Sequence, residues 1–240
     1  MAPALRAVSR LCVCHGAGNR GRLRGVGYIL YGDAGSGSAP VEMALAEVGA
    51  AVELRAVPLE GDHQLRADYR AINPMGRLPT LILPDGTVMT ESLAILVTLA
   101  DIHPRLLPPP GDPGRARALR WMALLAGEFY PQITRWDYPA RFGVSPHQHQ
   151  ALRDGALAMA RDVMRVVEAH AGLTGDPAAP FLLGTQFTVA DIYLAVLSRW
   201  AEGRVWTPAN LPKIEALAQA VARRPAIAPL WQRHGLATPA

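Results

Sequence analysis

Polar side chains stand at two places where a strand is expected to end and a helix to begin. Ser36 and Ser38 precede one apolar segment with helical spacing, and Glu91 and Ser92 precede another. The free N–H groups and the dipole at the start of a helix attract an anion. A hydroxyl at such a place either donates a hydrogen bond to that anion or caps the helix. The residues by themselves leave both interpretations open.

Two other polar patterns are interpreted as structural. Thr188-Val189-Ala190-Asp191 is a capping box ahead of an apolar run, and alanine at either end of it should cost about 0.5–2 kcal/mol of stability. His147 and His149 lie in a loop rich in Pro and Gln and offer only two ligands, so no metal site is predicted.

Composition indicates an ordinary globular protein. Of the 240 residues, 50% are hydrophobic and 18% are charged. No apolar run reaches the roughly 18–20 residues that span a bilayer, so no membrane partner is expected.

The net charge of +4 is local to the N-terminus. Residues 1–27 contain five arginines and no acid, and the rest of the chain has a formal charge of −1. A near-neutral body gives no reason to expect nucleic acid as a partner. We interpret residues 1–27 as a disordered or misassigned extension, with a transit peptide as the alternative. Cys12 and Cys14 lie in this extension and form no disulfide framework, so a cytoplasmic setting is expected.

The elements that must position the polar residues form two groups. From residue 28 to 104 the pattern predicts strand, helix, strand, a short helix, a β-hairpin and a further helix. Strands that first alternate with helices and then pair as a hairpin indicate a mixed sheet with helices packed on it. The predicted ranges are 28–31, 39–48, 52–57, 64–71, 80–83 with 87–89, and 92–101.

A Pro- and Gly-rich stretch separates the two groups. Residues 105–114 are interpreted as an interdomain linker, and residues 107–114 are predicted to exclude helix. Residues 115–240 show helical spacing and no convincing strand, which indicates a helical bundle. The predicted helices span residues 115–135, 151–171, 188–199, 211–223 and 226–234.

Four separated motifs resemble the glutathione transferase family over about residues 28–235. In chain order they are a Tyr-Gly-x-x-x-Ser loop ending at Ser36, Asn73-Pro74-Met75-Gly76-Arg77-Leu78-Pro79-Thr80-Leu81, Glu91-Ser92, and Phe181-Leu182-Leu183-Gly184-Thr185-Gln186-Phe187-Thr188-Val189-Ala190-Asp191. The second and fourth are specific, and the shared order strengthens the match. The resemblance implies an α/β thioredoxin-like N-terminal domain, an all-α C-terminal domain and glutathione as co-substrate.

The resemblance also implies how glutathione is held. Only about 5–6% of X-Pro bonds in folded proteins are cis, yet the family has a cis proline at the position of Pro79. The backbone of Leu78, next to Arg77, would pair with the cysteinyl residue as an added strand does. Ser92 and Glu91 would take the carboxylate and the ammonium of the γ-glutamyl end. The glycyl carboxylate would face one of two neighbours, His63 or Gln64.

The same resemblance calls for a hydroxyl that stabilises the glutathione thiolate. One hydrogen bond to a charged group contributes about 1.5–3 kcal/mol, or one to two units of thiol pKa. We prefer Ser36 to Ser38 for this role. Gly37 takes the place of the cysteine in beta-class relatives, which disfavours a cysteine-type redox enzyme. Tyr31 is interpreted as part of the core or a wall, and not as the donor tyrosine of the alpha, mu and pi classes.

The helical half is expected to shape the pocket for the second substrate. Tyr130, Arg135 and Tyr138 are its predicted lining. The function implied is a glutathione transferase of the detoxification type, which conjugates the thiolate to a small apolar electrophile and acts as a homodimer. The alternatives are a glutathione-dependent isomerase or disulfide reductase on the same fold, and a non-catalytic binding module.

Overall fold

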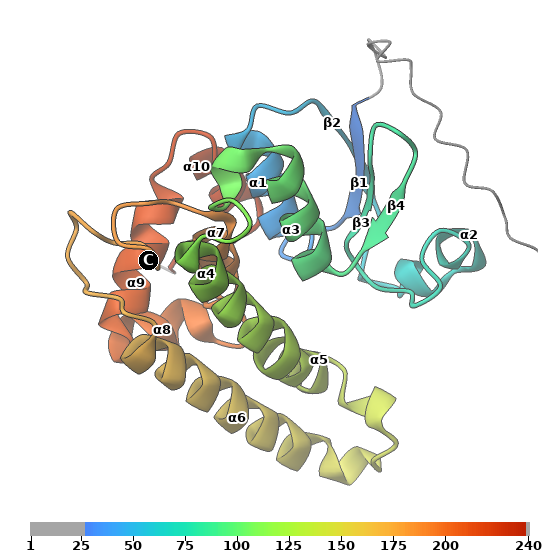
Figure 1. Ribbon diagram of the computed structural model, residues 1–240. Helices are drawn as coiled ribbons and strands as arrows, with labels where there is room; N and C mark the ends of the chain where they lie inside the picture. Colours follow the sequence, from blue (N-terminus) through green and yellow to red (C-terminus); the bar gives the residue numbers. More distant parts are fainter. Residues whose placement is uncertain (1–26, 239–240) are drawn as a thin grey trace, which may run out of the picture.

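The first domain is built on a mixed four-stranded sheet. The structure is a computed structural model that describes residues 27–238, so the predictions about residues 1–26 lie outside the described residues. The strands β1 (Tyr28–Gly32), β2 (Val52–Ala56), β3 (Thr80–Ile82) and β4 (Val88–Thr90) lie in the order β2-β1-β3-β4 (Figure 1). The β1–β2 pair is parallel, and the β1–β3 and β3–β4 pairs are antiparallel. The predicted mixed sheet and hairpin are confirmed.

The two faces of the central strand β1 bury different clusters. Tyr28 and Leu30 face the main core with helices α1 (Ala39–Glu47) and α3 (Ser92–Ile102). Ile29 and Tyr31 face a smaller cluster beside helix α2 (Ala67–Arg70), which lies on the other side of the sheet (Figure 1). Side chains alternate along a strand, so one five-residue segment joins both layers. The placement of Tyr31 in a core is confirmed.

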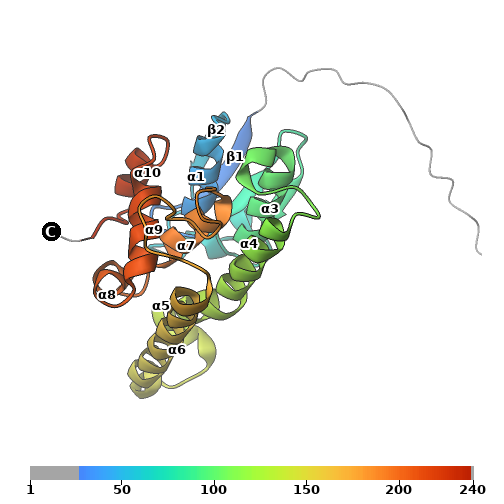
Figure 2. The ribbon, with the colours of Figure 1, turned by 60° about the vertical axis from the view of Figure 1, so that its left-hand side comes forward.

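The second domain is helical. Its elements are α4 (Pro113–Leu124), a π-helical segment (Leu125–Phe129), α5 (Tyr130–Asp137), α6 (His149–His170), α7 (Val189–Leu197), α8 (Gly203–Asn210), α9 (Pro212–Ala222) and α10 (Ala228–Arg233). Short 3-10 turns cover His63–Leu65, Pro104–Leu106, Pro139–Phe142 and Pro146–Gln148. Helices α5 and α6 pack together into an arm that extends away from the sheet (Figures 1 and 2).

Helix α7 lies at the centre of the second domain. Each of its residues is buried, and it packs against α1, α4 and α9, so it joins the two domains. The predicted capping box is confirmed: Asp191 accepts hydrogen bonds from the N–H of Thr188 at 2.7 Å and from its hydroxyl at 2.8 Å. The same carboxylate also accepts the N–H of Leu182 at 2.7 Å, which fixes the preceding loop to the helix.

Three details of the prediction for the linker and the helical half are wrong. Residues 107–114 do not exclude helix, because Asp112 caps α4 and Pro113 occupies its first turn, where a missing N–H costs nothing. The helix expected over residues 115–135 is interrupted by the π-helical segment, since Pro131 cannot donate to the carbonyl four residues earlier. Helix α8 was not expected, because Pro208 lies inside it.

Within residues 27–238, no helix is both long and apolar enough to cross a membrane.

We predict that Asp191→Ala lowers the free energy of unfolding by about 2–4 kcal/mol, more than loss of the capping box alone, because the buried N–H of Leu182 also loses its charged acceptor. Urea unfolding measures the change. Asp162→Ala, an exposed aspartate on α6, is the control and should change stability little. Equal losses in both variants would contradict the role given to the capping box.

Candidate functional site

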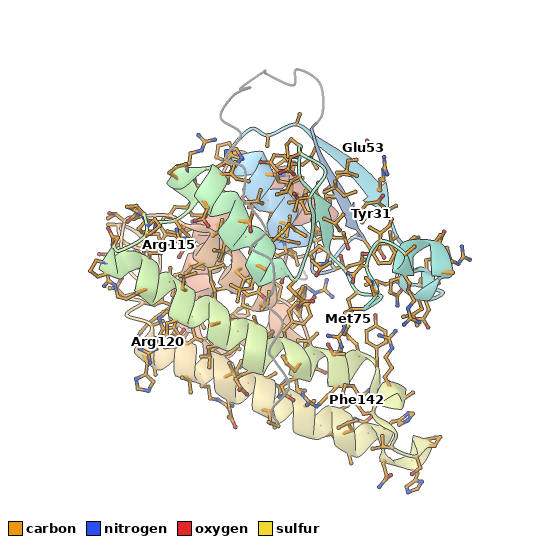
Figure 3. All side chains as sticks on the ribbon, turned by 45° about the vertical axis from the view of Figure 1, so that its right-hand side comes forward. Tyr31, Glu53, Met75, Arg115, Arg120 and Phe142 are labelled. Carbon is orange, nitrogen blue, oxygen red and sulfur yellow. The ribbon has the colours of Figure 1, made fainter. Side chains whose placement is uncertain are left out.

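A cavity of about 710 Å³ lies between the two domains. Its walls come from the β1–α1 loop, the segment before β3, the start of α3, the arm of α5, helix α7 and the C-terminal segment. Phe142, which lines the cavity, is seen in Figure 3 on the arm, below the loop that carries Met75. The cavity is lined by ten of the predicted site residues: Ser36, Gln64, Arg77, Leu78, Pro79, Glu91, Ser92, Tyr130, Arg135 and Tyr138.

The segment before β3 presents free backbone groups to this cavity. The Leu78–Pro79 peptide is cis, which confirms that expectation. Within the described part of the chain, neither the N–H nor the C=O of Leu78 makes a hydrogen bond, although the residue is buried. Buried backbone groups are nearly always paired. An extended peptide lying along Leu78 would pair with both.

The residues that precede Leu78 are held in place by side chains. The Asn73 amide and the Tyr69 hydroxyl each donate to the carbonyl of Arg77 at 2.8 Å. Gly76 has a φ of +59°, and a Cβ there would lie 2.9 Å from the carbonyl oxygen of Gln64. Glycine is therefore required at this turn both for its conformation and for lack of space.

Glu91 and Ser92 begin α3 in an unusual conformation. Glu91 is exposed with a φ of 63° and a ψ of 109°, a backbone state that costs about 1–3 kcal/mol and is concentrated at functional sites. The Ser92 hydroxyl does not cap the helix and instead lies 3.2 Å from the hydroxyl of Tyr193 on α7. Both residues line the cavity at the positive end of α3, which suits a ligand carrying a carboxylate and an ammonium.

Gln64 and His63 are placed differently. Gln64 is buried, lines the cavity and donates to Asp62 at 2.8 Å, while its Oε1 has no partner among the described residues. His63 does not line the cavity. Of the two neighbours proposed for the glycyl carboxylate, only Gln64 therefore lines the cavity.

The two serines at the start of α1 bond mainly to their own loop. The Ser36 hydroxyl donates to the carbonyl of Asp33 at 2.8 Å and accepts the N–H groups of Asp33 and Ser38, each at 3.2 Å. The Ser38 hydroxyl lies 3.2 Å from the same carbonyl and 2.9 Å from that of Ser36. Ser36 lines the cavity, and Ser38 does not.

The arm of α5 supplies aromatic and cationic walls. Tyr130 packs its ring edge-on against Trp200 at 5.1 Å between centroids. The Arg141 guanidinium lies 3.8 Å from the centre of the Tyr138 ring and pairs with Asp62 of the first domain at 2.8 Å. Arg135 lies over Phe142 at 5.4 Å.

Burial raises the pKa of Asp137, another lining residue, to about 6, although Arg141 and Arg153 act in the opposite direction.

A contact from the C-terminal segment was missed by the sequence analysis. The N–H of Gly35 donates to Nδ1 of His234 at 3.0 Å, so Nε2 carries the proton and donates to Glu42 at 3.1 Å. Although burial of Glu42 opposes it, the hydrogen bonds from His234 and Arg233 hold the pKa of this carboxyl below its usual value. The loop before α1 is thus fixed by the last helix, through a pair 199 residues apart that no sequence motif indicates.

Comparison with known proteins gives consistent matches. The model of the glutathione S-transferase N-terminal domain matches residues 38–102. The chain is 30% identical over 208 residues to the uncharacterized GST-like protein YncG of Escherichia coli K12, which spans 85% of this chain and 97% of that protein. It is 30% identical over 174 residues to the glutathione S-transferase GstA of Escherichia coli O157:H7, covering 70% of this chain and 79% of that one.

A solved structure extends the similarity to the whole fold. The glutathione transferase homologue from Sulfitobacter, crystallised with bound glutathione, superimposes with a TM-score of 0.77 at 28% identity. The match covers 86% of this chain and 98% of the Sulfitobacter chain.

We predict that His234→Ala lowers the free energy of unfolding by about 1–3 kcal/mol, because it leaves the Gly35 N–H and the Glu42 carboxylate without their buried partner. Urea unfolding measures the loss, and faster amide exchange at Gly35 locates it. His170→Ala, at an exposed histidine of α6, is the matched control. Unchanged exchange at Gly35 would show that His234 does not hold the loop.

Proposed function

The chain belongs to the glutathione transferase family, and we propose that it binds glutathione, stabilises the thiolate and transfers it to a small apolar electrophile. The observation that carries this proposal is the pair of Leu78 backbone groups that have no partner among residues 27–238, in a cavity that Glu91 and Ser92 also line. These groups match a short peptide with a zwitterionic end.

Each part of glutathione has a place in the proposed complex. The cysteinyl residue pairs with the backbone of Leu78. The γ-glutamyl carboxylate meets the N–H groups and hydroxyl at the start of α3, and its ammonium meets Glu91. The glycyl end lies near Gln64 and Arg77. The aromatic walls of the arm then face the sulfur and receive the electrophile.

The reaction in this proposal requires only an ionised thiol. The thiol gives its proton to water, the sulfur attacks an electrophilic carbon, and the new S–C bond displaces a leaving group such as chloride. The donor predicted from the sequence is Ser36, and that assignment stays a prediction.

The alternative functions differ in measurable ways. A glutathione-dependent disulfide reductase would oxidise two glutathione molecules to glutathione disulfide for each disulfide reduced, whereas a cysteine-type redox enzyme would need a thiol in the active loop, where this chain has Gly37. An isomerase would use glutathione without consuming it. A binding module would bind glutathione without turnover. We also expect a cytoplasmic homodimer that acts on toxic electrophiles.

The test has two parts. Calorimetric titration with glutathione measures binding, and chloride release from chlorodinitrobenzene measures conjugation. We predict saturable binding and turnover that depends on glutathione. Binding without turnover of this or other electrophiles would favour the module, and no binding at millimolar ligand would overturn the proposal.

We predict that Glu91→Gln weakens glutathione binding about tenfold, since a charged hydrogen bond to the ammonium contributes about 1.5–3 kcal/mol. Calorimetric titration measures the dissociation constant. Glu53→Gln is the matched control, because Glu53 lies on β2 at the far edge of the sheet (Figure 3) and pairs with Arg55. An unchanged constant in Glu91→Gln would remove Glu91 from the binding site.

A further inference from the structure

The hydroxyl of Tyr130 occupies the space above Gly37 at the start of α1. A Cβ added to Gly37 would overlap the Tyr130 hydroxyl oxygen, and it would lie 3.0 Å from the carbonyl oxygen of Leu78 and 3.2 Å from Cδ of Pro79. The hydroxyl from the helical domain therefore lies where the loop before α1 meets the Leu78–Pro79 turn. Within residues 27–238, this hydroxyl makes no hydrogen bond.

The serines at the same helix start have no free proton to offer. Each serine hydroxyl has a single O–H. The protons of Ser36 and Ser38 are directed to the carbonyl of Asp33 and to each other. The N–H groups of Asp33 and Ser38 occupy the acceptor side of Ser36. A ligand sulfur would have to break this local network to gain a hydrogen bond from either serine.

We propose that the Tyr130 hydroxyl, and not Ser36, donates the hydrogen bond that stabilises the glutathione thiolate in this protein. The inference rests on the proposed function, because it needs glutathione docked along Leu78.

The expected position of the sulfur agrees with this assignment. The sulfur of a cysteinyl residue is two bonds from the Cα whose backbone pairs with Leu78. A Cβ on Gly37 would lie next to both the Leu78 carbonyl oxygen and the Tyr130 hydroxyl, so these two groups border the same space. The sulfur thus reaches the space between α1 and Tyr130, where the N-terminus of α1 also favours negative charge.

Tyr130 is held firmly enough to act as a fixed donor. Its ring packs edge-on against Trp200, and it begins α5 directly after the π-helical segment. Such segments are frequent at functional sites, where they change the direction of the following side chains. Burial raises the pKa of the Tyr130 hydroxyl, with Tyr193 and Glu91 acting in the same direction, so it keeps its proton at neutral pH. It stabilises the thiolate while the thiol proton leaves to solvent.

The residue at position 37 fits the same explanation. Gly37 does not adopt a positive φ, so its backbone conformation does not require glycine. Its lack of a side chain instead leaves room for the tyrosine hydroxyl. A donor from the second domain thus takes the place that a side chain of the first domain would fill.

The test is the pKa of the thiol of bound glutathione, followed by the ultraviolet absorbance of the thiolate as pH is raised. A hydrogen bond to a charged sulfur is strong enough to lower a thiol pKa by about one to two units. We predict that Tyr130→Phe raises the pKa of the bound thiol by about that amount and leaves the glutathione dissociation constant within about threefold. Thermal unfolding checks that the variant is folded.

Two matched variants give the controls. Tyr138→Phe removes another tyrosine hydroxyl from the same cavity and should leave the thiol pKa unchanged. Ser36→Ala should also leave it unchanged. A raised pKa in Ser36→Ala with no shift in Tyr130→Phe would overturn the inference in favour of the serine. No shift in either would overturn it in favour of the N–H groups of α1.

A second variant tests the geometry independently. Gly37→Ala should push the Tyr130 hydroxyl away and raise the thiol pKa as Tyr130→Phe does; because the new Cβ also crowds the Leu78 carbonyl, the pKa is measured at saturating glutathione. Because both changes remove the same contact, the double variant should show no larger shift than Tyr130→Phe alone. Additive shifts would contradict the proposed contact. Failure of the unaltered protein to bind glutathione, or a bound thiol with the pKa of free glutathione, would instead overturn the proposed function, and this inference with it.

Discussion

The backbone of Leu78 is the constraint on which the rest of the site depends. Its N–H and C=O have no hydrogen-bond partner in the described chain, and Leu78 lines the cavity between the domains, where a ligand can pair with both groups. Asn73, Tyr69 and Gly76 all hold the turn that exposes these two groups. The first domain therefore leaves two of its own hydrogen bonds unmade just before β3, and a bound peptide would supply them.

The second domain completes this site from the opposite side. Tyr193 meets the hydroxyl of Ser92, His234 accepts the N–H of Gly35, and Arg141 pairs with Asp62 near the cavity. Helix α1 packs against α3, α7 and α10 and is almost entirely buried between the sheet and the helical domain. Side chains thus bridge the two domains at three points, of which the Arg141–Asp62 pair joins the arm to the first domain.

Local patterns in the sequence predicted much of the fold. Alternation along residues 28–31, the turn between the hairpin strands and the capping box at Thr188 depend on neighbours in the chain, so they could be predicted from spacing. The cis peptide at Pro79 came from a family resemblance and not from the residue alone. The contacts of His234 with Gly35 and of Tyr130 with the space at Gly37 join distant segments, and no local pattern indicates them. In a sequence, a glycine that is required because a side chain would not fit looks the same as a glycine that is required for its conformational freedom.

Amide hydrogen exchange at Leu78, measured by NMR with and without saturating glutathione, tests the central claim most directly. The account predicts that the Leu78 N–H exchanges freely in the unliganded protein and becomes strongly protected when glutathione binds, because the peptide then accepts its hydrogen bond. Glutathione binding with no change in exchange at Leu78 would contradict it, since the peptide would then be held elsewhere in the cavity.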